Sequence, residues 1–142
     1  MSAKQITGIY LRVSGYEPKF LIKRKVGPFH DQLDVFRPWE KIDIVRELIK
    51  LLDKEFEDFL KKFAAVDEKH YKNSSHRTRY YITKDINKLY PTKDEKFTKE
   101  HSFSYKDYFV GTNIGAKEIM QYVREMCEAC DISFGSCSEI KL

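Results

Sequence analysis

Hydrophobic and polar residues alternate along the first part of the chain, and this period of two predicts β-strands at residues 5–14 and 19–26. Between them, Gly15-Tyr16-Glu17-Pro18 has the composition of a hairpin loop. A short third strand is predicted at residues 33–36. One side of the first predicted strand carries Thr7, Ile9, Leu11 and Val13.

After Trp39 the hydrophobic residues recur at spacings of three and four, which is the period of an amphipathic α-helix. Charged residues occupy the opposite side, and no glycine or proline interrupts the run. The pattern therefore predicts one continuous helix with a buried face. The residues of that face are Val45, Leu48, Ile49, Leu52, Phe56, Phe59, Leu60 and Phe63.

Two further strands are predicted in the middle of the chain, at residues 78–83 and 102–110. The lysine-rich residues 84–100 lie between them and predict an exposed loop with one short helical turn near residues 85–89.

A second amphipathic helix is predicted at residues 116–130, with Thr112 or Asn113 as its N-cap. The alternation of residues 132–142 predicts a closing strand. Strands grouped around two helices indicate an α+β fold with a mainly antiparallel sheet of about five strands. The expected order is β-β-(β)-α-β-β-α-β, with one long and one shorter helix packed on one face.

The 142 residues, 42% of them hydrophobic, match the usual size and composition of one folded domain, which we expect to span residues 1–142. No apolar stretch reaches the length of a membrane span, and the first residues lack the apolar core of a signal peptide. Three cysteines close to one end favour a reducing compartment. We therefore predict a cytoplasmic protein that does not engage the membrane.

Charge is distributed unevenly along the chain, although the net charge is only +4. Residues 39–68 contain 6 basic and 9 acidic residues, whereas residues 69–107 contain 10 basic and 5 acidic residues. This segregation predicts one positively charged surface.

The stretch from Lys69 to Lys84 combines basic residues with three tyrosines and contains no acidic residue. Lysine and arginine attract phosphates, and exposed tyrosines stack on bases. In a strand, Arg77, Arg79 and Tyr81 would share one side, which we expect to face solvent. An ordinary solvated sheet edge is the alternative interpretation. The predicted binding residues are Lys72, Arg77, Arg79, Tyr81 and Lys84, extended by Lys23 and Lys25 if the strands are neighbours.

A glycine-containing loop, Gly111-Thr112-Asn113-Ile114-Gly115, lies between a predicted strand and a predicted helix. Free backbone amides and the helix dipole bind anions at such a position, here through Thr112, Asn113 and Gly115. The loop lacks the Gly-Lys-Ser/Thr ending of a P-loop, and a structural turn with a capped helix also explains both glycines.

Candidate catalytic and metal-binding residues are few. His70 and His76 provide an acid and a base for phosphate-ester chemistry, with Arg77 and Arg79 to hold the charge. Cys127 and Cys130 have the spacing of a redox or zinc pair, with Cys137 nearby. Both Cys127 and Cys130 fall on the hydrophobic side of the second helix, so we expect reduced, buried thiols without metal. No cofactor is predicted.

These observations favour a small non-catalytic binding or regulatory protein. Its basic, tyrosine-rich face would engage an anionic partner, either nucleic acid or an acidic protein surface, and an inhibitor of another protein's nucleic-acid site fits the same description. One alternative is a protein that binds or sequesters a nucleotide-like ligand through residues 111–115. Another is a small phosphoesterase or nuclease that uses His70 and His76. The sequence does not indicate the oligomeric state.

Overall fold

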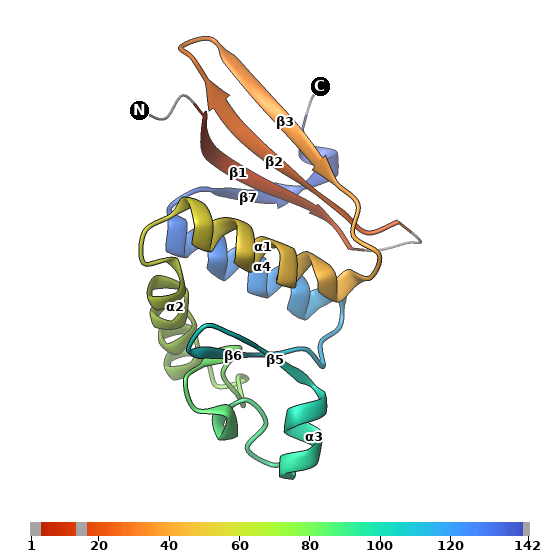
Figure 1. Cartoon of the computed structure of the whole chain (residues 1–142), viewed down its shortest axis with the longest axis vertical. Coiled ribbons are helices and arrows are strands. Elements are labelled where there is room, and N and C mark those ends of the chain that lie inside the picture. The colour runs from red at the N-terminus through yellow and green to blue at the C-terminus, as the bar shows by residue number, and fades with distance from the viewer. Residues whose placement is uncertain (1–3, 14–16, 141–142) are drawn as a thin grey trace.

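The computed structural model describes residues 4–13 and 17–140 and confirms the α+β class (Figure 1). The strands described are β1 (Lys4–Arg12), β2 (Lys19–Val26), β3 (His30–Phe36), β4 (Ile82–Thr83), β5 (Ser102–Tyr105), β6 (Tyr108–Gly111) and β7 (Ser133–Ser136). The α-helices described are α1 (Lys41–Glu55), α2 (Phe59–Asn73), α3 (Glu95–Glu100) and α4 (Ala116–Cys130), with 3-10 turns η1 (Ile86–Lys88) and η2 (Cys137–Glu139).

The strands form two sheets instead of the single sheet that we expected. The larger has the order β3-β2-β1-β7, in which β1 pairs antiparallel with β2 and parallel with β7. The smaller has the order β4-β6-β5 and is antiparallel. In Figure 1 the larger sheet lies at the top and the smaller one below, with α1 and α4 between them.

Hydrophobic side chains of β1 and β2 face α1 and α4 and form the core. Of the residues predicted to share one side of the first strand, Ile9, Leu11 and Val13 are buried, but Thr7 is only half-buried. The pairing of β1 with β2 is irregular between Ile6 and Gly8, so that Ile6 reaches the core in place of Thr7. The predicted loop between β1 and β2 lies partly outside the described residues, at positions 14–16.

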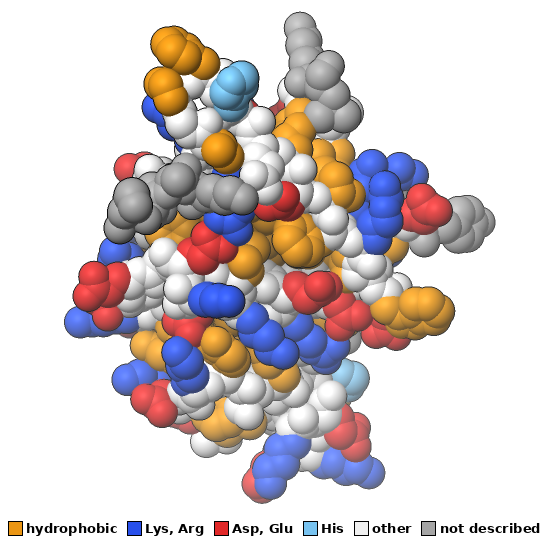
Figure 2. Space-filling view, turned by 45° about the horizontal axis from the view of Figure 1, so that its top comes forward, with side chains coloured by type: hydrophobic (Ala, Val, Ile, Leu, Met, Phe, Trp, Pro, Cys, Tyr) orange, Lys and Arg blue, Asp and Glu red, His pale blue; other side chains and the backbone are white. Residues whose placement is uncertain are grey.

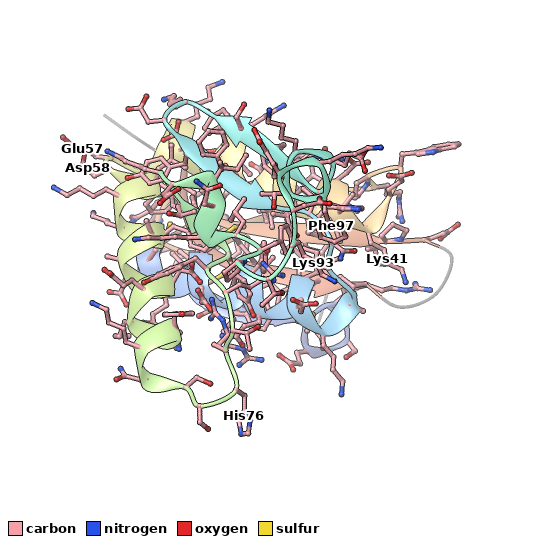
Figure 3. The ribbon with its side chains drawn as sticks, turned by 90° about the horizontal axis from the view of Figure 1, so that it is seen from below. Lys41, Glu57, Asp58, His76, Lys93 and Phe97 are labelled. Atoms are coloured by element: carbon pink, nitrogen blue, oxygen red, sulfur yellow. The ribbon has the colours of Figure 1, made fainter. Side chains whose placement is uncertain are left out.

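The predicted continuous helix is divided into α1 and α2, so this prediction was wrong. Leu52, Phe59 and Phe63 are buried as expected, but Phe56 is extended and half-buried, and Asp58 has a φ of 57°. Aspartate adopts the left-handed conformation more readily than most residues, so the chain turns here without a glycine. Figure 3 shows Asp58 where α2 begins.

The second long helix, α4, has the predicted bounds. Its buried side includes Ile119, Tyr122, Val123 and Met126. The N-cap is Gly115, not Thr112 or Asn113. After α4 the predicted closing strand is short, because β7 ends at Ser136 and η2 follows.

The middle of the chain differs most from prediction. The predicted strand at 102–110 is a hairpin, β5 and β6, whose turn contains Lys106 with a φ of 52°. The predicted strand at 78–83 is reduced to β4. The turn near residues 85–89 is confirmed as η1, but α3 was missed, although the side chain of Asp94 caps it by accepting from the Phe97 amide.

The smaller sheet is attached to α1 by polar and aromatic contacts. The Tyr105 hydroxyl donates to Asp53 Oδ2 at 2.9 Å, and the Arg46 guanidinium lies 5.6 Å from the centroid of the Phe103 ring. The two sheets therefore pack on opposite sides of the helices.

Candidate functional site

The predicted basic residues do not form one surface. Lys23 and Lys25 belong to β2 in the larger sheet, whereas Lys84 follows β4 in the smaller sheet on the other side of the helices (Figure 1). The condition for joining them, that their strands be neighbours, is not met. Lys23 also forms an ion pair with Asp31 at 3.6 Å.

Arg77 is largely buried, so the prediction that its side chain faces solvent was wrong. Its guanidinium donates from Nη2 to Asp67 Oδ1 at 2.5 Å and from Nη1 to Glu125 Oε2 at 3.0 Å, and both acids are completely buried. The guanidinium carbon also lies 3.7 Å from the centroid of the Tyr81 ring. Arg77 therefore connects α2 and α4 inside the protein.

Arg79 is likewise enclosed, contrary to the prediction of an exposed side chain. It donates to Glu118 at 2.7 Å and to the hydroxyl of Tyr122 at 3.1 Å, and only 12% of its side chain is exposed. Tyr122 in turn donates to the carbonyl of Gly111 at 2.8 Å. Arg79 thus connects the segment before β4 to α4, and Tyr122 connects α4 to the end of β6.

The same buried acid explains why residues 78–81 do not form the predicted strand. Asp67 Oδ2 accepts from the backbone amides of Tyr81 at 2.7 Å and of Ile82 at 3.2 Å, while Arg77 donates to the carbonyl of Arg79. These groups bond to side chains in place of a neighbouring strand. Tyr81 is buried against Tyr122, with ring centroids 4.0 Å apart, and cannot stack on a ligand.

Glu125 is the least satisfied member of this network. Its Oε2 accepts from Arg77 and Gln121. Its Oε1 has no hydrogen-bond partner among the described residues. Burial, followed by the adjacent Asp67 carboxylate, raises the pKa of Glu125 to about 8, and Arg77 opposes the rise. A neutral Glu125 leaves Arg77 and Asp67 as a balanced buried pair.

This elevated pKa predicts a pH-dependent stability. Between the ordinary glutamate pKa and about 8, folded Glu125 holds a proton that the unfolded chain has released. Its stabilisation is therefore present at low pH and is lost as the pH rises through this range, by up to about 1.4 kcal/mol per pH unit.

Urea unfolding between pH 5 and 8 should show this decline in the free energy of unfolding, and Glu125→Gln should flatten it. An unchanged slope in Glu125→Gln, with Glu57→Gln as the exposed control, would contradict the assignment.

The two histidines are not brought together as an acid and a base. His70 Nε2 lies 3.0 Å from Glu128 Oε1, which ties the end of α2 to α4. His76 is exposed, and Figure 3 shows it at the tip of the loop after α2, pointing away from the rest of the molecule. The described contacts thus give no support to a paired catalytic role.

The loop before α4 is less available to an anion than its sequence predicts. The amide of Thr112 donates to the carbonyl of His101 at 2.7 Å, and the amide of Asn113 donates to the Tyr90 hydroxyl at 2.8 Å. The premise of free amides is therefore wrong for both residues. Gly115 has open space where a side chain would begin, so packing does not require a glycine there.

Cys127 is buried as predicted, and Cys130 is half-buried. Burial raises the pKa of Cys130 to about 12 and also raises that of Cys127, so both thiols stay protonated near neutral pH. No group of three or more His, Cys, Asp or Glu suited to a metal ion occurs within residues 4–13 and 17–140.

A groove of about 350 Å³ lies beside Lys84, and we call it the tyrosine-lysine groove. Two half-buried tyrosines and two exposed lysines give it its chemical character. Its lining consists of Ala64, Glu68, Tyr80, Ile82, Thr83, Lys84, Lys88 and Tyr108.

Each lysine of the groove lies near an aromatic ring. Lys84 Nζ is 5.3 Å from the centroid of Tyr108, and Lys88 Nζ is 5.7 Å from that of Tyr80. Neither lysine has a carboxylate within 4.0 Å among the residues described, whereas Glu68 pairs with Lys72 at 3.3 Å. Tyr80 is stacked against Tyr71, with ring centroids 4.3 Å apart. The groove therefore places two aromatic rings next to positive charges that no carboxylate among the described residues compensates.

Sequence reasoning found Lys84 but missed Lys88, Tyr80 and Tyr108 as partners in a site. Pairing of β4 with β6 places Ile82 opposite Val110, which brings Tyr108 to the groove. The fold of η1 brings Lys88 back, since the Tyr80 amide donates to the Lys88 carbonyl at 3.4 Å. Tyrosines occur close to both lysines in the sequence, and this was the available signal. The spacing of Tyr80, Lys84, Lys88 and Tyr108 along the chain did not indicate that their side chains meet.

Comparison with protein-family models, curated proteins and solved structures finds no match to this chain. In the part of the chain that is described, no helix combines the length and the apolar character needed to span a lipid bilayer.

Proposed function

We propose that this protein is a non-catalytic binding protein that holds single-stranded nucleic acid in the tyrosine-lysine groove. The observation that carries the proposal is the placement of Lys84 and Lys88, without carboxylate partners among the described residues, next to Tyr108 and Tyr80. Tyrosine rings stack on bases of any sequence, and lysines neutralise the adjoining phosphates.

In the proposed mode of binding, the tyrosines contact bases and the lysines contact phosphates. A base stacks against Tyr108 or Tyr80, and the ammonium groups of Lys84 and Lys88 contact the phosphates on either side. The stacking of Tyr71 on Tyr80 limits the motion of that ring, so little side-chain entropy is lost when a base contacts it. The groove has the size of a small ligand site, so a strand would place one base in it and continue across the surface.

This proposal retains the preferred function and moves its site. Arg77 and Arg79 support the groove from inside, because they fix the segment that carries Tyr80, and they do not contact the ligand. Lys72 remains exposed at the end of α2, where its pairing with Glu68 reduces its charge toward a ligand.

The test is a charge reversal with a matched control on the opposite sheet. Lys84→Glu with Lys88→Glu should abolish most binding to a fluorescent oligo-dT, measured by anisotropy, and should lower the slope of log K against log salt by about 1.4, the value for two single-strand phosphate contacts. Lys23→Glu with Lys25→Glu makes the same change in net charge on β2 and should have a much smaller effect.

A second substitution separates stacking from charge. Tyr108→Leu keeps a hydrophobic side chain but removes the aromatic face, and we expect about 5- to 150-fold weaker binding, corresponding to about 1–3 kcal/mol per stacked base. Equal losses in the two charge-reversed proteins would show a general charge effect and contradict the groove as the site. Absence of binding to any single-stranded nucleic acid would overturn the proposed function.

A further inference from the structure

Three large hydrophobic side chains of the described residues are strongly exposed, and all three lie in or next to β3, an edge strand of the larger sheet. Phe29 is 89% exposed and precedes β3, Val35 is 50% exposed within β3, and Trp39 is 92% exposed shortly after it. In Figure 2 hydrophobic side chains project at the upper left and at the right of the molecule, with others between them. Burial of one large side chain is worth about 1.5–3 kcal/mol, so a partner that covered these side chains would gain a substantial hydrophobic contribution.

The strand between these side chains has an open edge. Among the described strands, β3 pairs only with β2, so its other side leaves backbone N–H and C=O groups without strand partners. Soluble proteins commonly protect such an edge with charged residues, proline or a bulge. β3 contains no lysine, no proline and no irregularity in its pairing with β2, and its acidic residues are Asp31 and Asp34. Its seven residues match the usual length of a pairing strand.

The sequence of β3 is suited to pairing with itself. In an antiparallel arrangement centred on Leu33, Leu33 faces the partner's Leu33, Gln32 faces the partner's Asp34, and Asp31 faces the partner's Val35. No pair of like charges lies directly opposite. Centring on Asp34 instead would place two aspartates face to face, which is unfavourable.

The two aspartates of β3 are also neutralised within their own chain. Arg24 donates to Asp34 at 3.2 Å, and Lys23 lies 3.6 Å from Asp31. Gln32 already donates to Asp34 at 2.7 Å, so the same pair of residue types bonds well in this sheet. Two copies of the strand can therefore approach without an electrostatic penalty.

We propose that β3 is a homodimerisation edge, along which two copies of this chain join their four-stranded sheets across a two-fold axis centred on Leu33. In this register Phe29 faces the partner's Arg37, a favourable arrangement for a cation and an aromatic ring. Trp39 lies just beyond the pairing, near the partner's β2–β3 turn. Two copies each of Phe29 and Trp39, at about 150–250 Å² per aromatic side chain, add about 600–1,000 Å² to the area buried by the strands. Together with strand pairing, this approaches the area of a stable interface.

The first experiment measures mass in solution. Sedimentation velocity over a range of concentrations should show a species of twice the 16.9 kDa of one chain. Val35→Asp places a second aspartate opposite the partner's Asp31, and this like-charge pair should shift the protein to monomer. Val35 is exposed, so this variant should fold, which circular dichroism can verify. Ala65→Asp adds the same charge to an exposed position of α2 and should leave the dimer intact.

The second experiment tests the register. Leu33→Cys places two thiols opposite each other at the two-fold axis and should yield a disulfide-linked dimer under mild oxidation. Val35→Cys places the equivalent thiols four residues out of register, too far apart for a disulfide, and should yield no more crosslinking than the unsubstituted chain. The proposal would be overturned if the protein stayed monomeric up to about 100 μM, because such an association would be weaker than that of typical stable homodimers. A dimer that survives Val35→Asp would also overturn it.

Discussion

Replacement of Arg77 by glutamate is expected to unfold the protein or come close to it. The substitution removes the partner of two completely buried carboxyl groups, Asp67 and Glu125, and adds a third acid between them. Breaking a buried ion pair by removing one partner costs about 3–5 kcal/mol, because the remaining charge has no compensation. The whole stability of a domain is about 5–15 kcal/mol.

A milder set of variants gives the same test quantitatively. Arg77→Met should lower the free energy of unfolding by about 3–5 kcal/mol in urea. Adding Glu125→Gln should recover part of this loss, since it removes one of the stranded acids, and a double-mutant cycle measures the recovery. Lys84→Glu, at an exposed position, is the control and should change stability by less than about 0.5 kcal/mol.

A loss below about 1 kcal/mol in Arg77→Met would mean that the guanidinium is solvated and that the buried network is wrong. Stability measurements on the same variants also distinguish loss of ligand binding through unfolding from loss of ligand binding in a folded protein. Arg77 variants will lose ligand binding by unfolding, whereas Lys84→Glu and Lys88→Glu should lose it while folded.

Truncation of Phe59 to alanine is expected to lower the free energy of unfolding by about 3–5 kcal/mol, the usual range for a buried phenylalanine. Phe59 is completely buried at the first position of α2 and stacks with Phe63 at a centroid distance of 5.7 Å. The cavity left by the substitution lies directly after the turn at Asp58. This turn contains no glycine or proline.

Chemical denaturation of Phe59→Ala and of Lys61→Ala, on the exposed side of the same helix, measures this effect. The lysine variant should differ from the parent by less than about 0.5 kcal/mol. A comparable small change in Phe59→Ala would show that the hydrophobic side of α2 is not packed against the core.

Much of the secondary structure is determined locally and follows from the sequence. The alternation in β1 and β2, the helical period of α4 and the turn capped by Asp85 each depend on neighbours in the chain, so their positions agree with prediction. The hydrophobic side of the predicted long helix is also correct for Leu52, Phe59 and Phe63, although the helix is divided.

The errors arise where a distant residue decides the local conformation. Asp67 on α2 takes the backbone amides of Tyr81 and Ile82, which removes most of a predicted strand and turns the arginines inward. A period of two places residues on one side of a strand, but it does not say whether that side meets solvent or two buried acids from other helices.

The candidate site was likewise predictable in part from the sequence and in part only from the tertiary structure. The sequence alone indicated that lysine and tyrosine were concentrated after residue 69, and so it predicted the chemistry of an anion-binding surface. Only the tertiary structure separated Lys23 and Lys25 from Lys84, and only the pairing of β4 with β6 brought Tyr108 to Tyr80 and Lys88. Composition and period are properties of neighbouring residues, whereas a groove depends on contacts between residues far apart in the chain, which the packing of the core determines.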